Sequence, residues 1–121
     1  MTIASAYTLE DVVKLLDDTY SAFIDKEERY SESLGNALEQ LKGITRKYPE
    51  DTELKEYFTN FKAFNKKRPE LSRAEEKKGL TALISDLKHK VHWRKLWMSS
   101  GKDLPYKDYR SLRGEVGRRG L

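Results

Sequence analysis

Residues 72–91, SRAEEKKGLTALISDLKHKV, contain the clearest helix boundary in the chain. Ser72 and Glu75 have the S-x-x-E spacing of a capping box, in which each side chain bonds the backbone N–H of the other at the start of a helix. Beyond the box, apolar side chains recur every three or four positions, at Leu80, Leu83, Ile84, Leu87 and Val91. This spacing predicts a long helix with one buried stripe.

The pattern changes after Val91. The large side chains that follow are displaced by one or two positions from the stripe: Trp93, Leu96, Trp97 and Met98. We therefore expect this helix either to bend near residues 88–92 or to expose a second apolar face. Ser99, Ser100 and Gly101 should end it, since glycine often follows the last turn of a helix.

Three further helices are expected before this one. The first begins at a Thr8–Asp11 capping pair and runs to about residue 24, and residues 25–29 form a polar connection. The second runs from near Ser31 to Pro49. The third is capped by Asp51 or Thr52 and closed by Pro69. Its aromatic face is assigned to the core: Leu54, Tyr57, Phe58, Phe61 and Phe64.

The helical pattern and the short connections predict an all-α fold, an antiparallel four-helix bundle over residues 1–101. Residues 102–121 contain Pro105 and three glycines and show no sustained period, so they are interpreted as a basic C-terminal tail. Four side chains could pin this tail: Leu104, Tyr106, Tyr109 and Leu112. A chain of 121 residues suits a single core.

Charge is divided unevenly along the chain. Residues 88–121 hold ten Lys/Arg and three acids, a net charge of +7, whereas residues 1–87 hold 14 Lys/Arg and 17 acids, a net charge of −3. A mildly acidic body with a basic, tryptophan-containing C-terminal arm indicates a binding surface for an anionic partner. The predicted partner-binding residues are Trp93, Arg94, Lys95, Trp97, Lys102, Tyr106, Lys107, Tyr109, Arg110, Arg113, Arg118 and Arg119.

No catalytic motif accompanies this arm, so we expect a protein that is not an enzyme and uses no cofactor. His89 and His92 share a helix face with Asp86, but their neighbours Lys88 and Lys90 would repel a metal ion, and we expect no metal site. The chain has no cysteine, no signal peptide and no apolar stretch long enough to span a membrane. A cytoplasmic monomer is expected, with access to the inner face of the membrane.

The order of these features resembles the immunity proteins of pediocin-like (class IIa) bacteriocins. The likeness covers about residues 10–109 and is carried by three stretches: Tyr30-Ser31-Glu32 with Leu34, Leu38 and Leu41; the aromatic third helix up to Asn65-Lys66; and Leu71-Ser72-Arg73-Ala74-Glu75-Glu76 leading into the stripe from Leu80 to Leu87. The chain departs from that family in its strongly basic end and longer tail.

The resemblance implies a four-helix bundle without enzymatic activity. It also implies a membrane permease of the mannose phosphotransferase type, with bound bacteriocin, as the partner, and the C-terminal half as the part that sets specificity. The basic arm would suit the anionic inner leaflet. Two alternatives stay open from the residues alone. A small nucleic-acid-binding or phage-type regulatory protein would use Arg110–Arg119 on phosphates, and an enzyme inhibitor would use the acidic first helix.

Overall fold

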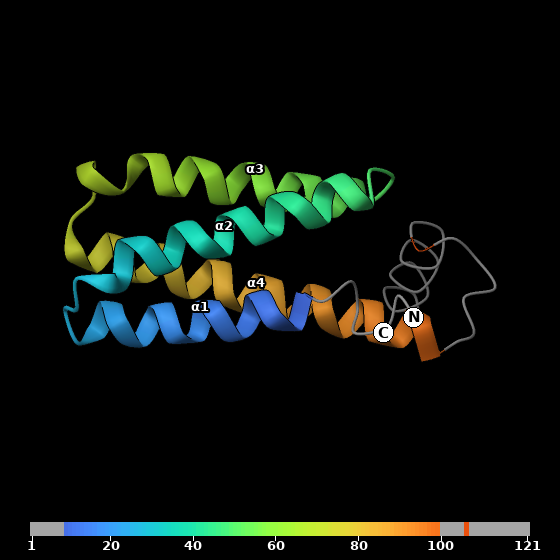
Figure 1. Cartoon of the computed structure of the whole chain (residues 1–121), viewed down its shortest axis with the longest axis horizontal. Coiled ribbons are helices and arrows are strands. Elements are labelled where there is room, and N and C mark those ends of the chain that lie inside the picture. The colour runs from blue at the N-terminus through green and yellow to red at the C-terminus, as the bar shows by residue number, and fades with distance from the viewer. Residues whose placement is uncertain (1–8, 100–105, 107–121) are drawn as a thin grey trace, which may run out of the picture.

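The computed structural model describes residues 9–99 and 106. Within them the chain forms α1 (Leu9–Ile24), α2 (Arg29–Lys47), α3 (Thr52–Lys67), the short 3-10 helix η2 (Arg68–Glu70) and α4 (Arg73–Ser99). Figure 1 shows the four helices along the long axis, with the α1–α2 and α3–α4 connections at one end and the α2–α3 connection at the other. The predictions of an all-α fold and of four helices are confirmed.

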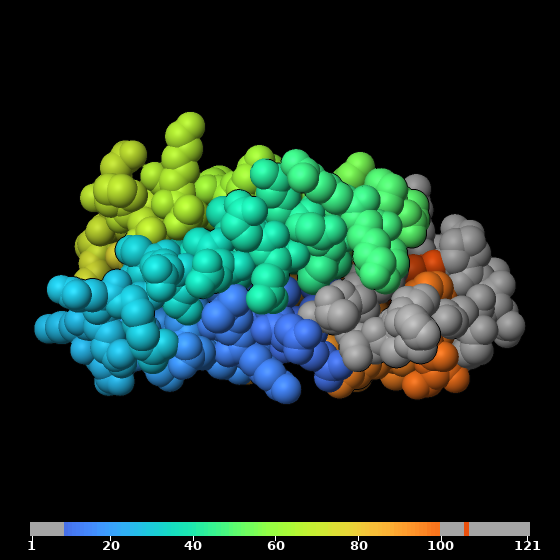
Figure 2. All heavy atoms as spheres, in the orientation of Figure 1, coloured from blue at the N-terminus to red at the C-terminus, as the bar shows by residue number. Residues whose placement is uncertain are grey.

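One hydrophobic core lies between the four helices. α1 packs against α2 and α4, and α2 packs against α3; Figure 2 shows α1 and α2 side by side on the viewed face. Removal of these apolar side chains from water is the main favourable contribution to folding. The buried core residues are Leu9, Val12, Leu16, Phe23, Leu34, Ala37, Leu41, Ile44, Leu54, Tyr57, Phe61, Leu80, Leu83, Ile84, Leu87 and Val91.

The two strongest helix starts predicted from the sequence are present. Asp51 caps α3 by accepting a hydrogen bond from the Leu54 N–H at 3.1 Å. At the start of α4, the Ser72 hydroxyl accepts from the Glu75 N–H at 3.1 Å, and the Ser72 N–H donates to the Glu75 carboxylate at 2.9 Å. The Ser72 N–H lowers the pKa of the Glu75 carboxyl. The predicted cap at Thr8 lies outside the described residues.

Two helix boundaries differ from the expectation. α2 begins at Arg29 rather than near Ser31, and the Arg29 guanidinium bonds Asp18 at 2.6 Å and Glu27 at 2.7 Å. Arg29, which was expected to be the last residue of the polar connection, is therefore the first residue of α2. Pro69 does not end α3 abruptly, because Arg68–Glu70 continue as one turn of 3-10 helix before α4.

The end of α1 depends on a lysine in a left-handed conformation. Lys26 has φ 57°, and around it the Glu27 N–H bonds the Ala22 carbonyl at 2.9 Å while the Lys26 N–H bonds the Phe23 carbonyl at 3.1 Å. This pair of bonds is a Schellman motif, in which glycine is the usual residue at the left-handed position. Arg73 of α4 supports the same turn by donating to the Phe23 carbonyl at 2.7 Å.

Replacing Lys26 by glycine should therefore stabilise the fold. A left-handed conformation costs a residue with a Cβ about 1–2 kcal/mol, and part of the gain is offset by the larger unfolded-state entropy of glycine. We expect Lys26→Gly to raise the free energy of unfolding by about 0.5–1 kcal/mol in urea titrations. Lys26→Ala, which keeps the Cβ, should change it little; an equal gain in both variants would contradict the role of φ.

Candidate interaction site on helix α4

The buried stripe of α4 continues beyond Val91 through a charged residue. α4 is one helix from Arg73 to Ser99, and its buried residues are Leu80, Leu83, Ile84, Leu87, Val91 and Arg94. Arg94 follows Val91 by three positions and Leu87 by seven, so it lies on the same face. The helical period therefore does not slip after Val91. The next position of the buried stripe is occupied by an arginine, which a pattern of apolar residues does not include.

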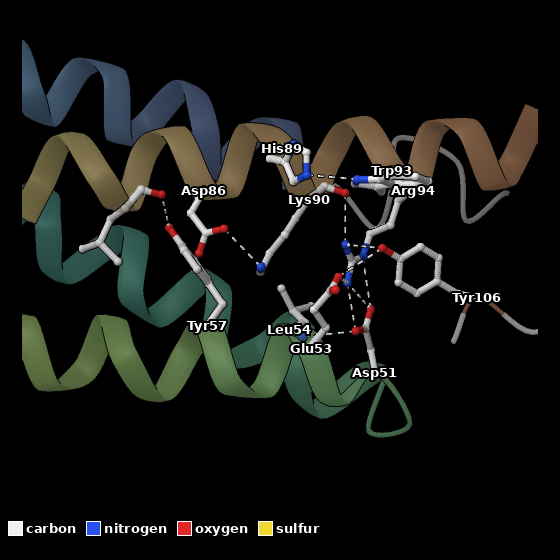
Figure 3. Close-up of polar contacts among 11 residues, drawn as sticks. Asp51, Glu53, Leu54, Tyr57, Asp86, His89, Lys90, Trp93, Arg94 and Tyr106 are labelled. Atoms are coloured by element: carbon white, nitrogen blue, oxygen red, sulfur yellow. Dashed lines mark hydrogen bonds and ion pairs between the residues drawn. The ribbon is translucent and has the colours of Figure 1, made fainter. Parts of the chain in front are cut away.

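Arg94 is fully buried and paired with a buried carboxylate. Its Nη2 lies 2.8 Å from both carboxylate oxygens of Asp51, and its Nε donates to Asp51 Oδ2 at 3.1 Å. The side chains of Arg94 and Asp51 are 0% and 2% exposed. Figure 3 shows the guanidinium reaching from α4 to the turn before α3. The pair therefore joins the middle of the chain to its C-terminal third.

Tyr106, which follows α4 in the sequence, also belongs to this network. Its hydroxyl accepts from Arg94 Nη1 at 3.1 Å and donates to the Glu53 carboxylate at 3.1 Å. Its ring makes an edge contact with the indole of Trp97, with ring centroids 5.6 Å apart. Tyr106 is buried and Trp97 is partly buried against the core. A residue of the predicted tail is thus fixed on the helices.

The lysines of the second half of α4 also have acidic partners. Lys88 Nζ lies 3.5 Å from Asp17 and Lys95 Nζ lies 2.7 Å from Glu10, both acids belonging to α1. Lys90 Nζ lies 3.2 Å from Asp86 one turn earlier. Together with Arg94 and Asp51, these contacts neutralise the cations of this half-helix within the fold. Part of the charge division seen in the sequence is therefore satisfied internally.

The exposed side of the same half-helix is aromatic and imidazole-rich. His89 and His92 are exposed and Trp93 is partly exposed. The Trp93 Nε1–H donates to His89 Nε2 at 3.0 Å, and the two rings meet edge to face. Figure 3 shows Asp86, Lys90 and Arg94 directed from α4 towards α3, and this bond between His89 and Trp93 beside α4.

A shallow groove follows the seam between α4 and α1. It is lined by Asp17, Tyr20, Thr81, Ile84, Ser85 and Lys88.

The structure corrects several site predictions. Arg94 and Tyr106 were predicted to meet a partner but are buried, because each completes the other's hydrogen bonds inside the fold. Trp97 packs against the core rather than facing away from it. Trp93 and Lys95 do reach the surface. The other predicted residues lie outside the described part: Lys102, Lys107, Tyr109, Arg110, Arg113, Arg118 and Arg119.

The side chains gathered on the second half of α4 are suited to binding a partner. Within residues 9–99 and 106, no three His, Asp or Glu side chains gather into a group that could hold a metal ion. None of the helices in that part is both long and apolar enough to cross a bilayer. The sequence patterns did not pair Asp51 with Arg94. Two signals for this pair were present in the sequence: the cap at Asp51 and the position of Arg94 on the buried stripe of α4.

Removing Arg94 should be strongly destabilising. Arg94→Met leaves the Asp51 carboxylate buried without its cation, and loss of one partner of a buried pair costs about 3–5 kcal/mol. We expect this loss in the free energy of unfolding, measured by urea titration followed by circular dichroism. Asp51→Asn in the Arg94→Met background should recover part of it, because the amide oxygen can still cap α3 and no charge remains buried.

The comparison of these variants separates charge from packing. Arg94→Lys keeps the charge but loses the planar fork that contacts both carboxylate oxygens, so its stability should fall between those of the wild type and Arg94→Met. If the double variant is as unstable as the sum of its single changes, the two residues are not energetically coupled and the role given to the pair is wrong.

Alkaline pH should destabilise the protein through buried phenols. Burial raises the pKa of Tyr30, Tyr57 and Tyr106. The unfolded chain therefore loses these protons first as the pH rises above roughly 10, so their contribution to stability is complete below that pH and declines above it. Urea titrations between pH 8 and 11.5 should show this fall. Tyr57→Phe should make the decline shallower, whereas an unchanged slope would contradict the assignment.

None of the family models, characterised proteins or solved structures compared with the chain matches it. The distinctive features of the second half of α4 are its contact with Tyr106, its paired lysines, and the exposed imidazoles beside Trp93.

Proposed function

We propose that this chain is an immunity protein of the pediocin-like bacteriocin class. It acts on the cytoplasmic side of the membrane and binds the permease that the bacteriocin engages, with the second half of α4 and the residues after it as the recognising part. The proposal originates in the sequence resemblance. It requires a helical body that holds a C-terminal recognition segment in a defined position.

The observation that carries the proposal is the tie between Tyr106 and the helices. The Tyr106 hydroxyl bridges Arg94 and Glu53, and its ring contacts Trp97. A recognising residue held in place before binding loses less conformational entropy on binding than an unattached one. The all-α fold with a single core also agrees with what the resemblance implies.

The ion pairs bear on the alternative of nucleic-acid binding. Phosphate recognition needs cations that can leave their carboxylate partners for a phosphate. In the described part of α4 beyond Asp86, Lys88, Arg94 and Lys95 face carboxylates of α1 or of the turn before α3. Arg94 is committed to the buried Asp51, whereas the exposed pairs of Lys88 and Lys95 can open, so experiment has to separate nucleic-acid binding from the proposal.

Expression in a bacteriocin-sensitive strain tests the proposal. We expect the full chain to raise the concentration of at least one pediocin-like peptide needed for killing by tenfold or more. Trp93→Ala should reduce this protection, since a partly exposed tryptophan in a recognition surface contributes strongly to binding. Unchanged killing across a panel of such peptides, with the protein expressed and folded, would refute the proposal.

A matched control and a transfer experiment locate the specificity. Lys14→Ala changes an exposed side chain of α1 and should leave protection intact. Replacing residues 88–121 by those of an immunity protein with another specificity, while retaining Arg94 and Tyr106, should change which peptide is resisted. Keeping these two residues retains the hydrogen bonds to Asp51 and Glu53, and circular dichroism of the chimera should confirm that it is folded.

A further inference from the structure

One face of α4 combines cations, imidazoles and tryptophan at the surface. Lys88, His89, His92 and Lys95 are exposed within about two turns of the helix, and Trp93 beside them is partly exposed. No acidic residue follows Asp86 within α4. Tryptophan with lysine on one side of a helix is the composition found where proteins lie on the headgroup region of a bilayer. We call these five residues the outer face of α4.

The two lysines of the outer face are neutralised from α1. Lys88 and Asp17 are 54% and 53% exposed, and Lys95 and Glu10 are 55% and 39% exposed. Ion pairs this exposed are weak, because water screens the charges and two flexible side chains have to be ordered. Their carboxylates nevertheless lie at the edge of the outer face. An approaching anionic surface therefore meets two cations and two anions, with no net charge.

We propose that the outer face of α4 docks on an anionic lipid surface and that Asp17 and Glu10 restrain this docking by neutralising Lys88 and Lys95. The inference goes beyond the immunity function and does not depend on it. The exposed pairs can open, and Lys88 and Lys95 then complement the charge of anionic lipid headgroups. At 3.6 residues per turn the five residues spread over roughly 160° of the helix circumference, on the half of α4 that faces away from its buried stripe, with Trp93 at one flank and the lysines at the other. The carboxylates of α1 compete with headgroup phosphates for the lysines.

Removal of the two carboxylates tests the restraint. The full-length Asp17→Asn/Glu10→Gln variant should partition onto vesicles of phosphatidylglycerol and phosphatidylcholine about tenfold more strongly than the wild type at pH 7.5 and low salt. Each uncompensated cation near such a surface strengthens binding about fivefold, so about tenfold lies between the effect of one freed lysine and that of two. The gain should disappear at 0.5 M salt.

A matched variant distinguishes position from overall charge. Asp25→Asn/Glu39→Gln changes the net charge equally, and both residues are exposed without a side-chain partner among residues 9–99 and 106. It should bind vesicles much less strongly than Asp17→Asn/Glu10→Gln. Equal binding of the two variants would overturn the proposal, since net charge alone would explain it. All variants should first show wild-type helicity.

Two further measurements complete the test. Adding Lys88→Gln and Lys95→Gln to the Asp17→Asn/Glu10→Gln variant should abolish the gain, and Trp93→Ala should reduce it severalfold. A gain that survives these changes would overturn the assignment to the outer face. Single-stranded oligonucleotide, used in parallel, should show a smaller gain than the vesicles. A gain with the oligonucleotide alone would replace the lipid by nucleic acid and refute the proposal.

Discussion

The buried pair of Arg94 and Asp51 is the constraint on which this end of the molecule depends. Asp51 accepts from the Leu54 N–H that begins α3 and also receives the Arg94 guanidinium from α4. A buried guanidinium is tolerated only where its hydrogen bonds are met, and here Asp51, Tyr106 and the Lys90 carbonyl meet them. A shift of α4 along its axis would leave Arg94 unpaired. The pair therefore fixes where α4 lies relative to α3.

The sequence predicted the elements whose signals are local. The Ser72–Glu75 box and the Asp51 cap are bonds between residues three apart, and the core stripe up to Val91 is a repeat along one helix. Arg94 could not be recognised in the same way. Its burial depends on a carboxylate 43 positions earlier, and patterns that treat arginine as a surface residue assign it outwards. The partner-binding role predicted for Tyr106 is wrong for the same reason, whereas its place among the side chains that could pin the tail agrees with its burial.

The charge division along the chain arises partly from residues that pair with one another in the fold. The body is acidic partly because α1 carries Asp17 and Glu10, and the arm is basic partly because α4 carries Lys88 and Lys95. Folding brings these opposite charges together across one seam. The uneven charge, which predicted an external partner, is thus explained in part by ion pairs between α1 and α4. Of the ten Lys/Arg in residues 88–121, six lie in the sequence after α4.

The cations of α4 consequently fall into two classes with different capacities for recognition. Exchanging the buried Asp51 for an external anion would leave Asp51 itself buried and unpaired, so Arg94 is committed to the fold. The carboxylates that face Lys88 and Lys95 remain solvated when the pairs open, and such exposed pairs differ little in free energy between closed and open forms. Lys88 and Lys95 can change partners, whereas Arg94 cannot. Recognition by α4 then requires that the helix be held by Arg94 while the exposed lysines exchange one anion for another.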